Sequence, residues 1–213
     1  MYIWLLRFLT AAVIGITALT KTPFVFLTLN TFLAYIPVEL SYQILLKPTR
    51  RRKIILLPVW MLFFPNIPYL LTDFVHVKRL HVYDAPNLEG IPDVRHWALF
   101  IILALLVFTY LLIGFTLANQ LIATIRPFSK NVWTRLGSWT IFSFFSALGV
   151  YVGRFPPRLH SAYFFTEPIK VFQIVFLNWS MDKLLIVGMF MVFHLWMFVL
   201  FHYTTKLLNE TKK

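Results

Sequence analysis

Six apolar runs, each about as long as a lipid bilayer is thick, constrain this chain more than any other feature. A helix needs roughly 20 apolar residues to cross the hydrocarbon core. The runs that reach that length are 2–19, 23–46, 54–72, 97–121, 134–153 and 183–205. A soluble domain of 213 residues could not bury a chain that is 59% hydrophobic. We therefore predict an all-α polytopic transmembrane helix bundle of about six spans, with residues 1–213 as a single membrane domain.

The basic residues are distributed as in a membrane protein. The net charge is +12, but Lys and Arg gather in the short segments between apolar runs, at 47–53, 126–135 and 206–213. This pattern excludes nucleic acid as the partner and indicates the lipid bilayer. With six spans, all three segments lie on one side, which the positive-inside rule makes cytoplasmic together with both termini. The oligomeric state is left open, and the absence of Cys excludes thiol chemistry.

Two longer segments, 73–96 and 154–182, are then predicted to be loops on the outer face. Six of the eight acidic residues fall within them. Loops of this length usually bind or catalyse, or else are disordered. Within the second, the apolar run 168–178 is too short to cross the bilayer, so we expect an interfacial or re-entrant piece.

The first outer segment carries the pattern D-x2-H-x4-H-x2-D, formed by Asp73, His76, His81 and Asp84. A carboxylate and an imidazole three residues apart share one helix face. Two such pairs could surround a divalent metal such as zinc, which accepts His nitrogen and carboxylate oxygen. The alternative is a polar loop at the level of the lipid headgroups, with histidines that face water.

The third apolar run is interrupted near its outer end by Pro65, Asn66 and Pro68. The prolines lack amide donors, so carbonyls near 61–64 lose their partners, and Asn66 could donate to them. Asn30 is expected at about the same depth. Irregular backbone at membrane depth is tolerated only inside protein or beside water. One interpretation is a helix broken at Pro65 and Pro68 that opens a polar pocket with Asn30 and Asn66 on its floor. The alternative is a proline kink in which Asn joins helices.

The rim of such a pocket would carry Tyr69, Asp73 and His76, and Arg154 at the end of the fifth run could clamp a phosphate or a carboxylate. Snorkelling of Arg154 to headgroups is an equal alternative. Deeper in the chain, Glu39 is predicted to pair with Arg7. His194, near the middle of the last run, is predicted to be a neutral helix contact or else a proton carrier.

The chain resembles a family of uncharacterised bacterial integral membrane proteins, domain of unknown function 1361. The resemblance rests on "LNTFLAYIPVELS" (29–41), "FFPNIPYLLTDFVHV" (63–77) and "GRFPPRLHSAYFFTEP" (153–168), and covers most of the chain. The positions typical of the family are Asn30, Asn66, Pro68, Tyr69, Asp73, His76 and Arg154. The resemblance implies a bacterial plasma membrane location but no activity. The chain departs from the family pattern at His160 and Tyr163, where Asn and Asp are expected.

Three functions fit these observations. The first is an enzyme at the outer face, a metal-assisted hydrolase or transferase acting on a lipid-linked, anionic or envelope substrate. Its catalytic residues would be Asp73 and His76, its metal ligands Asp73, His76, His81 and Asp84, and its substrate-binding residues Asn30, Asn66, Tyr69 and Arg154. The second is a transporter-like carrier that uses Glu39 and His194. The third is a non-catalytic membrane assembly or interaction protein.

Overall fold

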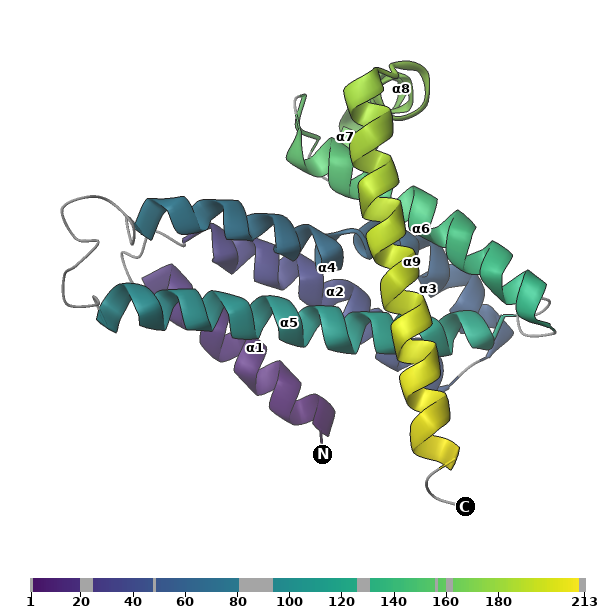
Figure 1. Ribbon diagram of the computed structural model, residues 1–213, viewed down its shortest axis with the longest axis horizontal. Helices are drawn as coiled ribbons and strands as arrows, with labels where there is room; N and C mark the ends of the chain where they lie inside the picture. Colours follow the sequence, from purple (N-terminus) through teal and green to yellow (C-terminus); the bar gives the residue numbers. More distant parts are fainter. Residues whose placement is uncertain are drawn as a thin grey trace.

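The computed structural model describes residues 2–19, 25–47, 49–80, 94–125, 131–155, 157–159 and 163–210, and all regular structure in these residues is helical. The α-helices are α1 (Tyr2–Leu19), α2 (Phe26–Leu46), α3 (Arg50–Phe63), α4 (Asn66–Tyr69), α5 (Val94–Ala123), α6 (Val132–Arg154), α7 (Tyr163–Thr166), α8 (Pro168–Phe172) and α9 (Met181–Glu210). A 3₁₀ helix, η1 (Leu70–Leu80), continues α4, and a π-helical segment, η3 (Gln173–Leu177), continues α8. The predicted all-α class is confirmed for the described residues (Figure 1).

Four helical segments are long and apolar enough to cross a membrane: Arg50–Lys78, Val94–Ala123, Val132–Arg154 and Met181–Leu207. They correspond to the predicted runs 54–72, 97–121, 134–153 and 183–205. The protein is therefore a membrane-embedded helical protein. The first two predicted runs also form helices. The apolar segment Ile3–Leu19 is shorter, and α2 carries Asn30, Glu39 and other polar residues along its 21 residues.

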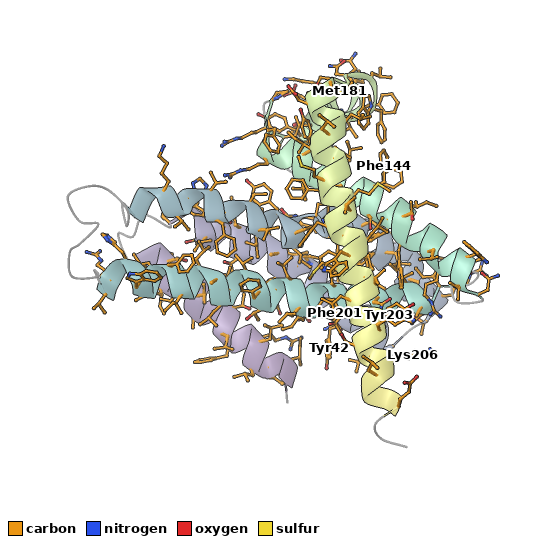
Figure 2. The ribbon with its side chains drawn as sticks, viewed as in Figure 1. Tyr42, Phe144, Met181, Phe201, Tyr203 and Lys206 are labelled. Atoms are coloured by element: carbon orange, nitrogen blue, oxygen red, sulfur yellow. The ribbon has the colours of Figure 1, made fainter. Side chains whose placement is uncertain are left out.

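An aromatic core joins helices that are distant in the sequence. The rings of Trp60 on α3 and Phe142 on α6 stack with centroids 4.9 Å apart, and Phe115 on α5 contacts Phe198 on α9 at 5.2 Å. Figure 1 shows α2, η1 and α5 along the long axis, with α9 crossing them steeply. Figure 2 marks the two ends of α9 with Met181, near α8, and Lys206, near the C-terminus.

The segment around Pro65 remains helical while its hydrogen bonding changes. Phe64 and Pro65, which separate α3 from α4, both keep right-handed helical dihedral angles. The Ile67 amide donates to the Phe64 carbonyl three residues back, at 2.9 Å, instead of four. Asn66 Nδ2 donates to the Phe63 carbonyl at 2.8 Å, so the predicted use of Asn66 on a freed carbonyl is confirmed.

Two glycines allow α4 to lie close to its neighbours. A Cβ atom added at Gly149 on α6 would stand 2.5 Å from Pro65 Cγ, and one added at Gly114 on α5 would stand 2.6 Å from Ile67 Cδ1. Small residues let membrane helices approach one another closely, because packing and not water exclusion holds helices together in lipid. The positions of Pro65 and Ile67 therefore depend on the absence of a side chain at Gly149 and Gly114.

We expect Gly149→Ala to destabilise the protein, because the rigid proline ring cannot move away from the new methyl group. Overpacking of this kind typically costs about 1–3 kcal/mol. The measurement is the thermal unfolding midpoint of the full chain in a mild, uncharged detergent.

Gly137→Ala is the matched control, since Gly137 lies on the same helix and a Cβ there would meet nothing within 4 Å. Both substitutions raise helix propensity equally. Equal midpoints for the two variants would show that the contact between Gly149 and Pro65 does not limit the approach of α4 to α6.

Candidate functional site

Asp73, at the first turn of η1, is fully buried. Asn30 on α2 donates from Nδ2 to Asp73 Oδ2 at 2.9 Å. Arg154, the last residue of α6, places Nη1 4.0 Å from Asp73 Oδ1. A carboxylate removed from water is stable only with partners, and here three helical elements supply the acid, the amide and the guanidinium. The structure thus brings together Asn30, Asp73 and Arg154, which are far apart in the sequence.

His76 shares the same Arg154 nitrogen. Arg154 Nη1 lies 3.3 Å from His76 Nε2, and the imidazole ring lies 4.3 Å from the ring of Phe26, centroid to centroid. An Arg can only donate, so in this contact His76 Nε2 is the acceptor. The guanidinium also lies 5.9 Å from the Tyr69 ring centroid. Arg154 is therefore the centre of this cluster.

A cavity of about 380 Å³ lies between α2, α4 and α6, next to the cluster. Its polar lining comes from Asn30, Asn66, Tyr69 and Arg158, and its apolar lining includes Leu29, Leu33, Leu62, Pro65, Val152 and Leu159. Asp73, His76 and Arg154 do not line it. Asn30 belongs to both, because it lines the cavity and donates to Asp73. The predicted pocket residues thus form a cavity and an adjacent charged cluster, connected by Asn30.

Asp73 and His76, two of the four predicted metal ligands, share a cationic neighbour. Both side chains face the guanidinium of Arg154, and a divalent cation beside it would be repelled. Within the described residues, no group of three or more His, Cys, Asp and Glu side chains could hold a metal. The other two predicted ligands, His81 and Asp84, lie outside the described residues.

The deeper charged and titratable residues have structural partners. Arg7 Nε donates to Glu39 Oε2 at 3.1 Å, which confirms the predicted pair, and Tyr35 and Gln43 donate to the same carboxylate. The buried His194 ring lies beside Phe115, and its Nδ1 lies 3.3 Å from the Ser143 carbonyl. His194 thus contacts two neighbouring helices, while its Nε2 has no hydrogen-bond partner among the described residues. His160 lies outside the described residues, and Tyr163 begins α7.

Sequence reasoning missed Arg158 and the glycines of α6. Arg158 follows α6, lines the cavity and donates from Nε to the Arg154 carbonyl at 3.1 Å. Gly149 and Gly153 also line the cavity. Their spacing, small-x3-small, is a known signal of close helix packing and could have identified this wall.

Lys183 was also missed, and it anchors the segment that follows α7. Its side chain is buried, and its Nζ donates to the carbonyls of Ile174, Val175 and Asn178 at 2.6–3.0 Å. The ammonium group therefore uses all three of its donors on the end of η3. This contact fixes the short apolar helix Pro168–Leu177, at the position predicted to be interfacial, to the start of α9.

Comparison with known proteins places the chain in a family without indicating an activity. No curated protein and no solved structure matches it. Residues 29–198 match the family described as Protein of unknown function (DUF1361). The match covers most of the chain and includes Asn30, Asn66, Asp73, Arg154 and Arg158. The chain therefore belongs to the family described as Protein of unknown function (DUF1361).

Proposed function

We propose that this protein binds an amphipathic anion, such as a lipid-linked phosphate, in the cavity between α2, α4 and α6, as the substrate of a hydrolase or transferase reaction. The observation that carries the proposal is the lining of the cavity. Amide, phenol and guanidinium groups line it together with several leucine side chains. Sites for small molecules are usually concave and mostly apolar, with a few polar groups that fix orientation.

The anionic head of the ligand would lie at Arg158, with Asn30, Asn66 and Tyr69 as hydrogen-bonding neighbours. The Arg158 side chain is exposed and lines the cavity, and its one hydrogen bond to a described residue is from Nε to the Arg154 carbonyl. Its two terminal nitrogens are left to form the paired hydrogen bonds that a phosphate or carboxylate accepts. Arg154, which was predicted to bind the substrate, does not line the cavity. We propose instead that its positive charge attracts the anionic head from nearby.

The apolar tail would leave the cavity sideways, along α2. Leu29 lines the cavity and is also 57% exposed on the surface of the protein. In a membrane-embedded protein, such a leucine faces lipid. The cavity therefore has an apolar edge at the lipid-facing surface, which suits a substrate that stays anchored in the bilayer while its head is bound.

Asp73 is the proposed general base and His76 its acid–base partner; because neither side chain lines the cavity, they would act on the bound head through an intervening water molecule. Asp73 Oδ1 has no hydrogen-bond partner among the described residues, although the side chain is fully buried. A buried polar atom without a partner calls for an explanation, and a contact with a ligand or a water molecule is one such explanation. Asn30 connects Asp73 to the cavity, because it lines the cavity and donates a hydrogen bond to the carboxylate. Asp73 thereby also fixes the orientation of the Asn30 amide.

In this proposal the protein crosses the plasma membrane of a bacterium six times, with both termini cytoplasmic and with the third span interrupted at Pro65 and Pro68. The support is the placement of Lys and Arg at 47–53, 126–135 and 206–213. The cavity then lies towards the outer leaflet. A carrier function has less support, since Glu39 is bound by Arg7, and neither Glu39 nor His194 lines the cavity.

We expect Arg158→Gln to weaken binding of dodecyl phosphate to the purified chain about tenfold or more, since hydrogen bonds to charged groups contribute about 1.5–3 kcal/mol. Binding is measured by native mass spectrometry from uncharged detergent. Dodecanol, with the same tail and no charge, should bind weakly to both proteins.

Lys170→Gln is the matched control, because Lys170 is an exposed cation in the same outer segment and does not line the cavity. If both substitutions weaken binding equally, general surface charge attracts the ligand and the proposed cavity site is wrong.

We expect Asp73→Asn to separate binding from chemistry. The variant keeps the shape of the side chain but removes a negative charge near the anion site, so dodecyl phosphate should bind as well as before or more tightly. At normal expression it should fail to rescue a phenotype caused by deleting the gene. Full rescue would rule out Asp73 as a general base.

We expect a cysteine at Thr49, in an otherwise Cys-free chain, to be protected from an impermeant thiol reagent added to intact cells, because the 47–53 segment is proposed to be cytoplasmic. Labelling after the cells are opened is the control. Labelling of intact cells would reverse the orientation and move the cavity to the inner leaflet.

A further inference from the structure

A second groove, of about 810 Å³, lies where α3 begins and α5 ends. Figure 1 shows both helix ends on the right-hand side of the molecule. The groove is lined by Arg50 and Lys53 at its charged part and by Ile54, Leu57 and Pro58 along its apolar part, with Thr124 opposite. It shares no lining residue with the cavity beside Asn30.

The charged part of the groove is strongly positive. Five Lys and Arg residues lie between 47 and 53, and no Asp or Glu occurs from residue 40 to residue 72. Arg52 turns away and donates to the Gln43 carbonyl at 3.0 Å. In the described part of the chain, the Arg50 side chain makes no hydrogen bond or ion pair. Arg50 is therefore available for an anion from outside the protein.

Lys53 is held in place at the edge of the groove. Its Nζ donates to the Thr124 carbonyl at the end of α5, at 2.8 Å, and two further N–H donors remain. The contact fixes the ammonium group beside Arg50, one helical turn further along α3. Arg50 and Lys53 lie on one face of α3, and the position of Lys53 is fixed. The two cations therefore form a defined binding site and not a diffuse positive surface.

The apolar part of the groove continues along the same face of α3. Ile54 and Leu57 follow Lys53 towards the middle of the helix, and Ile54 is 64% exposed. This order, from cations at the helix end to aliphatic side chains within it, is the order of headgroup and acyl chain in a phospholipid.

We infer that this groove is a binding site for an anionic phospholipid of the adjoining leaflet. The phosphate would lie between Arg50 and Lys53, and the acyl chain would lie along Ile54, Leu57 and Pro58. Charge complementarity selects the anionic lipid, because a zwitterionic headgroup would place its own cation beside two others. The bound lipid would hold the start of α3 against the end of α5.

The test uses the full chain in nanodiscs of phosphatidylcholine with or without phosphatidylglycerol, and the readout is the number of phosphatidylglycerol molecules retained in native mass spectrometry after extraction. We expect the double variant Arg50→Gln/Lys53→Gln to lower the affinity for phosphatidylglycerol on the order of 20-fold, about fivefold per charge. Because both leaflets carry the lipid, the result does not depend on orientation.

The matched control is Lys47→Gln/Arg51→Gln, which removes the same charge from exposed residues of the same segment that do not line the groove. It should keep the tightly bound lipid. An equal loss in the two double variants would overturn the proposal, since it would show attraction by the net charge of the segment alone.

The double variant also removes the contact between Lys53 and Thr124, which could disturb folding. Two further variants therefore test the lipid site while that contact stays in place. Arg50→Gln alone leaves that contact intact and should lower the affinity about fivefold. Ile54→Trp keeps both cations and fills the apolar part, so it should also reduce lipid retention. Unchanged retention in both variants would overturn the proposed site.

Discussion

The burial of the Asp73 carboxylate is the constraint on which the outer half of the protein depends. An ionised carboxylate that is removed from water must be met by donors or by an opposite charge, and breaking such a set costs several kcal/mol. Here the donors come from α2 and α6, and the acid comes from η1. The three elements are thereby fixed relative to one another. The cavity beside Asn30 is the space that this arrangement leaves between them.

Close backbone packing allows the charged cluster to form. Bare Cα positions at Gly149 and Gly114 let Pro65 and Ile67 lie against α6 and α5, so α4 leads into η1 at the depth where Arg154 ends α6. Aromatic stacking between α3, α5, α6 and α9 supplies the apolar support below. The two ends of the protein then differ in chemistry. The Asp73 end holds an acid among donors, and the other end presents Arg50 and Lys53 in a groove whose lining residues include no acid.

Several contacts were predictable because they arise from a strong local rule. An intramembrane Glu39 needs a cation, and Arg7 is the basic residue of the neighbouring apolar run. A proline leaves a nearby helix carbonyl without its amide donor, and the Asn66 side chain donates a hydrogen bond to such a carbonyl. Other features were harder to predict, since they depend on which helix ends meet. Arg158 lies in a segment without a recognisable pattern, and only the fold brings it to the cavity.

By itself, the sequence determined the membrane environment, the helical class, the positions of the long apolar helices and the polar residues available near Asp73. These follow from hydrophobic length and from the backbone's need for internal hydrogen bonds in lipid, both of which are local properties. The tertiary structure decided how those residues are used. It placed Arg154 beside both Asp73 and His76 and so gave this D-x2-H pair a guanidinium partner from another helix. The position of Arg154 depends on contacts between residues 78 to 81 positions apart in the chain. The spacing of residues within one segment cannot predict such contacts.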